Sequence, residues 1–177
     1  SLQLNIDRKE MRKAACCNLS ESFETSPLVD VSYPDPVSGI RQIQMLGLSS
    51  QYTGYSVENQ ISNVGILGGF FPSLIPGPWL ESIQVQKGIG PVTSGSGMLA
   101  GQINSGFSKA DSSSRLVANA YSSNMGRYEG NMLIPLRKNA AGGTQLFLHG
   151  NTTTTDMDMN ADAYRDFPIG KQVNAML

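Results

Sequence analysis

The most constraining feature of this 177-residue chain is a short alternating segment that leads into a run of glycines. Ile83 and Val85 stand between polar residues, and this period of two predicts a β-strand. Lys87-Gly88 is a turn signal, and the glycines that follow it are too frequent for a helix. A second strand is predicted through Gln102-Ile103-Asn104 as far as Phe107. This part of the chain therefore favours a sheet in which a glycine-rich loop connects two strands.

The only sustained helical pattern lies near the N-terminus, from Ile6 to Glu24. Asp7 is a candidate N-cap for this helix, and Pro27 is expected to end it. The apolar residues that recur at spacings of three and four are Met11, Ala14, Ala15, Leu19 and Phe23.

The middle of the chain predicts short strands with loops between them. Val29 to Tyr33 and Ile40 to Leu46 alternate apolar and polar residues around proline and glycine turn signals, which predicts a hairpin. Gln51 to Asn59 is expected to form another short strand. Ile61 to Pro78 is rich in glycine, proline and aromatic residues without a clear period, so we expect a loop that contains one short helical turn.

The sequence changes in character after Lys109. Asp111 to Ser114 is a polar break, so residues 1–109 and 110–177 are predicted to be separate domains. Three segments of strand length follow, namely Arg115 to Ser122, Arg127 to Arg137 and Thr144 to Thr152. The middle segment places Tyr128, Gly130, Met132, Ile134 and Leu136 on one face and Arg127, Glu129, Asn131 and Arg137 on the other. Outer-membrane barrels use strands with an apolar outer face, and so does any half-buried antiparallel meander.

Three blocks of the sequence resemble the plug domain of TonB-dependent outer-membrane receptors, in the order in which that family has them. The first is Ala14 to Pro27, and its Cys16-Cys17-Asn18-Leu19-Ser20-Glu21-Ser22-Phe23-Glu24 wording is closest to receptors of the Bacteroidetes type. The second is Gly39 to Leu48, and the third is Pro76 to Asn104. The resemblance implies an α+β fold class, with a small mixed-sheet plug domain followed by an antiparallel β-meander that begins a transmembrane β-barrel.

The same resemblance implies part of a receptor for energy-coupled nutrient uptake, because a plugged barrel needs about 22 strands. The expected substrate is a small molecule such as a metal chelate or a corrinoid, the expected partner is the TonB energy-coupling protein, and the expected location is the outer membrane. By position, the outward loops are Ser49 to Thr53 and Asn63 to Pro76. Tyr52, Phe70 and Phe71 are then the candidate substrate-binding residues, and at least one of them is expected to pack instead.

Composition argues against several other classes of function. Thirteen basic residues against fourteen acidic ones give a net charge of −1, which disfavours nucleic acid as a partner. The chain has one histidine and no nucleophile or zinc motif, so it is predicted not to be an enzyme. Gly95 and Gly97 match a loose dinucleotide pattern, but Gly101 interrupts the helix that the pattern requires. The adjacent Cys16-Cys17 pair favours packing as small apolar residues over metal capture with His149.

Two further interpretations stay open. Oxygen ligands for calcium are brought together in one loop by Asp158, Asn160, Asp162 and Asp166, although Ala163 occupies the sharp-turn position; the alternative is a solvated acidic loop. No other cofactor is expected. The three C-terminal strands would end in open edges, so we expect self-association through them. The rival to the receptor is a self-contained secreted or surface β-rich binding module, and the reading frame around the chain distinguishes the two.

Overall fold

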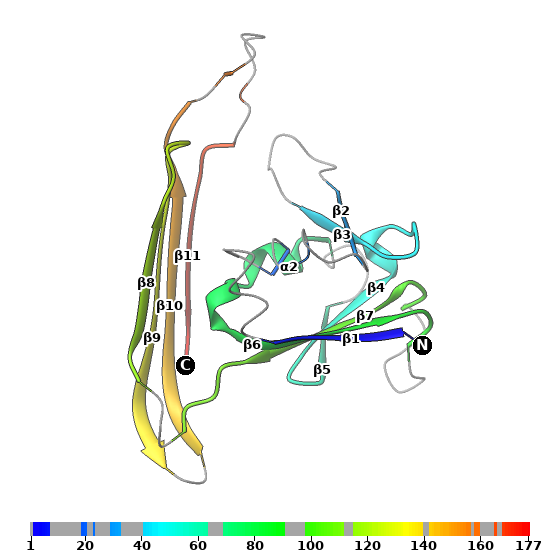
Figure 1. Cartoon of the computed structure of the whole chain (residues 1–177), viewed down its shortest axis with the longest axis horizontal. Coiled ribbons are helices and arrows are strands. Elements are labelled where there is room, and N and C mark those ends of the chain that lie inside the picture. Colours follow the sequence, from blue (N-terminus) through cyan, green and yellow to red (C-terminus); the bar gives the residue numbers. More distant parts are fainter. Residues whose placement is uncertain are drawn as a thin grey trace. The chain divides into compact units, whose positions relative to one another are not determined.

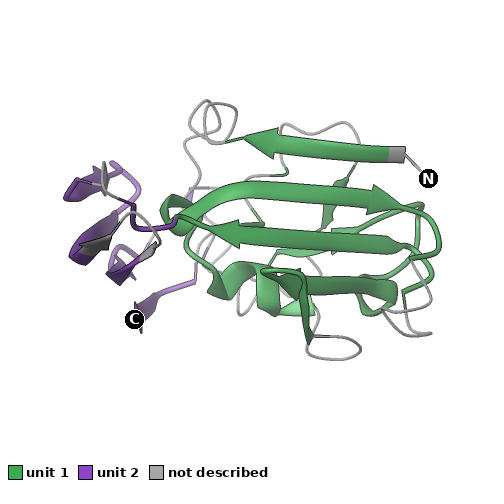
Figure 2. Ribbon diagram, turned by 90° about the horizontal axis from the view of Figure 1, so that it is seen from below, with its two compact units in different colours: residues 1–35, 40–108 green, residues 36–39, 109–177 purple. Residues whose placement is uncertain are grey.

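The computed structural model describes residues 2–7, 19–20, 23, 29–32, 41–63, 69–90, 98–111, 115–139, 142–156, 158–159, 165 and 168–177. The chain forms two compact units, one of residues 1–35 and 40–108 and the other of residues 36–39 and 109–177 (Figure 2). The described part is mostly β-sheet, with one α-helix of four residues, α2 (Phe71–Leu74).

A mixed five-stranded sheet forms the first unit (Figure 1). In spatial order its strands are β1 (Leu2–Asp7), β6 (Leu80–Lys87), β7 (Gly101–Phe107), β4 (Thr53–Val57) and β5 (Gln60–Asn63). β4 and β7 are parallel and the other neighbours are antiparallel. The predicted pair of strands around the glycine-rich loop is confirmed as β6 and β7, and the predicted strand after Gln51 is confirmed as β4. The sheet therefore contains the mixed pairing that was expected of this unit.

The prediction of a helix that starts at Ile6 is wrong. Ile6 and Asp7 belong to β1 and pair with Ile83 and Ser82 of β6. A strand forms at this position because the backbone pairs with β6 and the side chain of Ile6 packs into the apolar core, where Ile6 is 7% exposed. Residues 8–18, including the Cys16-Cys17 pair, lie outside the described residues.

Shorter elements complete the first unit. The predicted hairpin is confirmed over fewer residues, as the antiparallel pair β2 (Asp30–Ser32) and β3 (Gln42–Gln44). Two 3₁₀ helices, η2 (Ser50–Tyr52) and η4 (Gly77–Trp79), lead into β4 and β6. The segment expected to be a loop from Ile61 to Pro78 begins with most of β5, which the sequence reading missed. Its described residues contain α2 and the start of η4, where one helical turn was expected.

The two faces of the five-stranded sheet differ in chemistry. Tyr55, Val85 and Ile103 lie side by side across β4, β7 and β6 and are at most 1% exposed. The core on this face consists of Ile6, Leu19, Phe23, Val29, Ile43, Met45, Tyr55, Ile75, Leu80, Ile83, Val85, Ala100 and Ile103. On the opposite face the side chain of Asn104 donates to Gln84 at 3.3 Å and accepts from Ser56 at 3.1 Å. This second face is therefore tied together by amides and hydroxyls rather than by apolar contacts.

Gly101 fixes the start of β7. Its φ is +155°, and a Cβ there would overlap the carbonyl oxygen of Gln86. The backbones of β6 and β7 approach each other at this point in a way that only glycine permits.

The second unit is an antiparallel meander. Its strands β8 (Val117–Ser122), β9 (Arg127–Asn139), β10 (Gly142–Thr153) and β11 (Gly170–Met176) are neighbours in chain order. Three of them were predicted, and β11 was missed. On β9, Tyr128 and Met132 are 51% and 40% exposed, whereas Glu129 and Asn131 are 6% and 3% exposed. The predicted alternation is confirmed from Tyr128 to Met132, whereas Leu133, an apolar residue, is 2% exposed on the other face and Arg137 is exposed.

Within the parts of the chain described here, no helix combines the length and the apolar character that crossing a membrane requires.

Candidate functional site

The three aromatic residues predicted to contact a substrate separate into two environments. Tyr52 ends η2 and is 37% exposed, and Phe70 precedes α2 and is 39% exposed. Phe71 turns inward, packs against the core, and its ring centroid lies 5.9 Å from that of Tyr55. Phe71 is therefore a packing residue in this unit, and Tyr52 and Phe70 present their rings at the surface.

Tyr52 and Phe70 lie on segments that meet at Gln42 of β3. The hydroxyl of Ser50, two residues before Tyr52, donates to Gln42 Oε1 at 3.1 Å. Gly69, directly before Phe70, is buried beside the same two residues. A Cβ added to it would lie 3.0 Å from Gln42 Nε2 and 3.1 Å from Ser50 Oγ, so the site has no room for a side chain. We call this surface, formed by Gln42, Ser50, Tyr52, Gly69 and Phe70, the aromatic surface. Sequence reasoning missed Gln42 and Ser50, since their meeting depends on tertiary packing.

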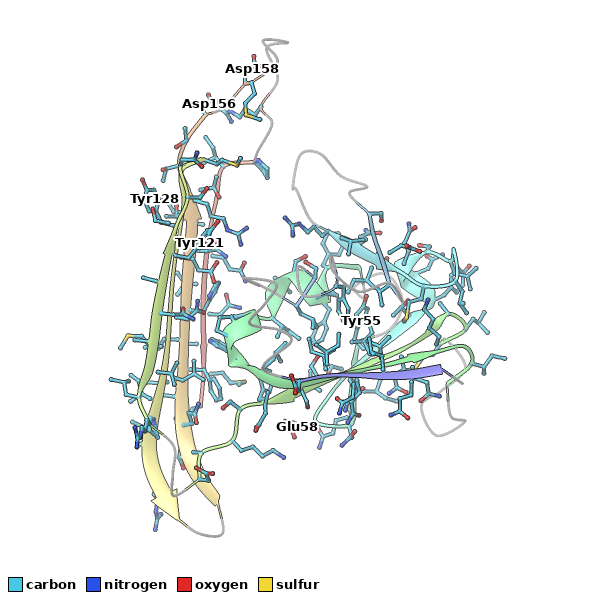
Figure 3. The ribbon with its side chains drawn as sticks, in the orientation of Figure 1. Tyr55, Glu58, Tyr121, Tyr128, Asp156 and Asp158 are labelled. Atoms are coloured by element: carbon cyan, nitrogen blue, oxygen red, sulfur yellow. The ribbon has the colours of Figure 1, made fainter. Side chains whose placement is uncertain are left out.

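Tyr55 lies on the side of the sheet that carries α2, and Glu58 lies on the other side (Figure 3). The side chain of Tyr55 is 1% exposed, and burial raises the pKa of its hydroxyl above the ordinary value. Among the described residues this hydroxyl has no hydrogen-bond partner. Tyr55 is therefore held as a neutral phenol that acts through its ring.

A buried polar network crosses three strands of the second unit. Asn131 Nδ2 donates to Glu129 Oε1 at 2.9 Å, and Asn131 Oδ1 lies 2.7 Å from His149 Nδ1. On the other side of the imidazole, Asn151 Nδ2 lies 3.2 Å from His149 Nε2 and 3.4 Å from Gln172 Oε1. The sequence reading mentioned His149 only as a remote partner for the cysteines, and it did not connect it with Glu129.

The directions of these hydrogen bonds follow from Glu129. An ionised carboxylate only accepts, so the amide of Asn131 must present its nitrogen to Glu129 and its oxygen to His149. His149 therefore carries its proton on Nδ1, and Nε2 accepts from Asn151. Arg127, 3.5 Å from Glu129, balances the negative charge at one end of the network. The result is a face with satisfied polar groups and little net charge.

The acidic segment after β10 contains an ion pair at its base. Arg165 Nε and Nη2 donate to the two carboxylate oxygens of Asp156 at 2.7 and 3.2 Å, and this contact raises the pKa of Arg165. Both side chains are more than half exposed. Of the four predicted calcium ligands, Asp158 is exposed, and Asn160, Asp162 and Asp166 lie outside the described residues. In the part of the chain that can be inspected, no three His, Cys, Asp or Glu side chains group as a metal site would require.

Comparison with known proteins shows which class of protein has a similar fold. No protein-family model and no curated protein matches the sequence. Among solved structures, the ferric-catecholate import receptor Fiu of E. coli K12 in its open form matches 90% of this chain and 22% of its own, with a TM-score of 0.69 and 15% identity. The fold is that of a TonB-dependent receptor.

Two other structures of this receptor class give the same result. The siderophore receptor PiuA of Acinetobacter baumannii matches 90% of this chain and 22% of its own at TM-score 0.65 and 12% identity. The copper transporter OprC matches 89% of this chain and 25% of its own at TM-score 0.63 and 16% identity. The chain thus spans about a quarter or less of these receptors. A match over 90% of the chain extends well into the second unit, because that unit contains residues 109–177.

Proposed function

We propose that this chain is part of a TonB-dependent outer-membrane receptor that takes up a small-molecule nutrient. Residues 1–109 form the plug that blocks the barrel lumen, and residues 110–177 form the first barrel strands. The observation that carries the proposal is the match of both units, in one alignment, to receptors for siderophores and to a copper transporter. On this proposal the chain is not an enzyme, and TonB supplies the energy for transport.

The connections of the meander support assignment to a barrel. β9 ends at Asn139 and β10 begins at Gly142, so the connection at this end is very short. At the other end, residues 154–169 connect β10 to β11. Outer-membrane barrels have short periplasmic turns and longer external loops. The side of the meander that carries residues 154–169 is then the external side.

The two faces of the meander support the same assignment. Tyr128, Met132 and Leu136 are 51%, 40% and 58% exposed, as lipid-facing side chains would be in an isolated chain. The buried network of Glu129, Asn131 and His149 is on the opposite face and would line the interior of the barrel.

The aromatic surface is our candidate for substrate contact. Tyr52 and Phe70 are partly exposed aromatic residues, and the residues Ser50 and Gly69 of their segments lie against Gln42, so the surface combines apolar area with hydrogen-bonding groups. In the external loop, Asp158, Asn160, Asp162 and Asp166 are the proposed calcium ligands, with Asp156 already paired to Arg165.

Uptake measurements in the source bacterium test the proposal. We expect the protein encoded by this reading frame to be recovered with the outer membrane, and its deletion to reduce uptake of one of two labelled probes, a ferric catecholate chelate or cyanocobalamin. Deletion of TonB should abolish the same uptake. Recovery of the protein from a secreted fraction, with uptake unchanged, would favour the self-contained β-rich binding module.

Variants in the same strain test the aromatic surface. Replacing both Tyr52 and Phe70 by Ala should weaken substrate binding by roughly tenfold or more, because aromatic anchors dominate contact surfaces. Leu74→Ala is the matched control, since Leu74 lies on α2 and is 55% exposed but is outside the aromatic surface. Equal loss in the control would mean that the effect comes from stability rather than from contact.

A further inference from the structure

The hydrogen-bonded network around His149 depends on the protonation of one side chain. The imidazole donates from Nδ1 to Asn131 Oδ1 at 2.7 Å and accepts at Nε2 from Asn151 Nδ2 at 3.2 Å. The same amide nitrogen of Asn151 donates its second hydrogen to Gln172 Oε1 at 3.4 Å. Only a neutral imidazole has a ring nitrogen that can accept. The observed arrangement therefore requires neutral His149.

The strand register connects His149 to β11 through side chains. Asn131 of β9 and Asn174 of β11 lie opposite His149 in one row across the sheet. Asn151 and Gln172 are paired in the next row and belong to the same face of the meander. Asn151 is thus the one side chain that is hydrogen-bonded both to the imidazole and to a side chain of β11 among the bonds described above.

Protonation of His149 at Nε2 is incompatible with this arrangement. Two N–H groups would then face each other where Asn151 Nδ2 lies 3.2 Å from Nε2, so the amide of Asn151 has to turn and present Oδ1. Its oxygen then replaces the nitrogen that lies 3.4 Å from Gln172 Oε1, and two acceptors face each other. Gln172 restores the hydrogen bond by turning its own amide and donating from Nε2. Unpaired buried polar groups are costly, so the two turns are coupled.

Two charged groups influence the protonation of His149 in opposite directions. Glu129 Oε1 lies 3.7 Å from His149 Nδ1, and Arg127 lies 3.5 Å from Glu129. Burial lowers the pKa of His149, Glu129 raises it, and Arg127 lowers it. Within two rows of His149 on this face, the described residues of β8 add Tyr121, and those of β10 and β11 add no charged or titratable group. The neutral imidazole is therefore the form at neutral pH, and the proton is taken up in acidic solution.

We propose that His149 is a proton-operated switch, in which protonation turns the amides of Asn151 and Gln172 and changes the hydrogen-bonding groups that β11 presents. The switch is a property of the meander and does not depend on the proposed function. Gln172 is partly exposed, and the half of its amide that is not bonded to Asn151 changes from nitrogen to oxygen. If this face lines a barrel, a solute meets a donor at neutral pH and an acceptor in acidic solution.

Nuclear magnetic resonance of the full chain tests the switch. The chain is studied in detergent micelles, which cover its exposed apolar face, and His149 is the one histidine, so a single ring signal reports its protonation. The ring signal should titrate with a midpoint below the ordinary value of 6.5. The side-chain amide signals of Asn151 and Gln172 should shift with the same midpoint. Asn104 of the first unit, whose amide is also hydrogen-bonded, is the internal control and should not follow that midpoint.

Substitutions separate the proton from the turn of the amides. In Asn151→Leu, which has a similar volume and no amide, His149 should still titrate but the Gln172 signal should no longer follow it. Glu129→Gln should lower the midpoint of His149, and Arg127→Gln should raise it, because the two charges act in opposite directions. Circular dichroism of each variant checks that the folded content is unchanged.

Three outcomes would overturn the inference. The first is titration of His149 in the wild type without a shift of the Asn151 and Gln172 amides. The second is a Gln172 signal that still follows His149 in Asn151→Leu. The third is an imidazole that stays neutral in the folded chain down to about pH 5. None of these outcomes affects the proposed function, which the uptake measurements test separately.

Discussion

The two units use apolar side chains in opposite ways. In the first unit Ile43, Met45 and Ile83 are completely buried, and the polar face of the sheet is the open one. In the second unit Leu136 and Val173 are 58% and 86% exposed, while Glu129, Asn131 and His149 are buried, together with Leu133 and Phe147. A sheet with its apolar face inward stabilises itself in water, whereas a sheet with its apolar face outward is stable where another apolar phase covers it. The contrast fits the proposed function, in which the two units have different surroundings.

Removal of a large buried side chain tests whether the first unit is stabilised by its own apolar interior. Trp79 is 4% exposed and its ring centroid lies 6.5 Å from that of Phe107. Trp79→Ala should lower the free energy of unfolding of the first unit by roughly 3–5 kcal/mol, measured by urea denaturation with circular dichroism. Leu74→Ala, at a site 55% exposed, is the control and should have little effect. A Trp79 variant that melts within about a degree of the wild type would contradict the assignment of a self-sufficient core.

Two glycine substitutions compare how tightly the backbone is constrained in the two units. Gly101→Ala places a methyl group against the carbonyl oxygen of Gln86 at a φ of +155°, so the first unit should lose roughly 2–3 kcal/mol. Gly130→Ala in the second unit meets open space and should change stability by less than about 0.5 kcal/mol. Thermal melts of the two variants measure the difference. Similar losses in both would mean that the backbone of β9 is as constrained as that of β7.

Self-association should follow from the outward apolar face. In water without detergent, the full chain should sediment as an oligomer and a chain ending at Lys109 as a monomer, since Met132 and Leu136 are exposed only in the former. Replacing both by Lys should weaken association by about tenfold. Replacing both Asn119 and Asn124 by Lys, at two exposed polar positions, is the charge-matched control. Monomers of both chain lengths at equal concentration would favour a self-contained β-module.

Of the substitutions predicted here, the one at Tyr55 should have the smallest effect on the free energy of unfolding at neutral pH. Burial raises the pKa of its hydroxyl, so the associated stability is present below about pH 10, where an unfolded tyrosine also keeps its proton. Above that pH only the unfolded chain ionises, and stability should fall by about 1.4 kcal/mol per pH unit.

Tyr55→Phe should remove this alkaline loss and change stability at pH 7 by less than about 1 kcal/mol, because the buried hydroxyl has no hydrogen-bond partner among the described residues. Tyr52→Phe, at an exposed site, should leave the alkaline loss in place. Identical pH profiles for the wild type and Tyr55→Phe would show that the phenol ionises freely.

Local patterns predicted the elements that have local causes. Alternation around Ile83 and Val85 gave β6, and the polar and apolar faces of β9 followed from the residues of that strand alone. Ile6 and Asp7, the last two residues of β1, were misread as the start of a helix because their partner strand β6 is more than 70 residues away in the sequence. β11 was missed because its apolar residues, Val173, Ala175 and Met176, fall on both faces of the strand and give no clear alternation.

The candidate sites were harder to predict than the strands. Tyr52 and Phe70 could be proposed from their place in the chain, but the approach of their segments to Gln42 depends on Ser50 and the buried Gly69. The hydrogen-bonded network joins Glu129 to His149 across neighbouring strands, and only the register of β9 and β10 brings them together. Sequence order contains no direct signal for contacts of this kind.

The order of strands in the first unit also determines when it can fold. β7 is the last of its strands in the chain, yet it lies in the middle of the sheet, between the β1–β6 pair and the β4–β5 pair. A nascent polypeptide that ends before Gly101 contains the strands of the β1–β6 and β4–β5 pairs but lacks β7, the strand that lies between the two pairs. Assembly of the complete sheet requires contacts between residues that are far apart in the sequence, such as the parallel pairing of Thr53 with Gly101. Contacts of this kind form slowly. Assembly of the complete five-stranded sheet therefore waits until its central strand, β7, is available.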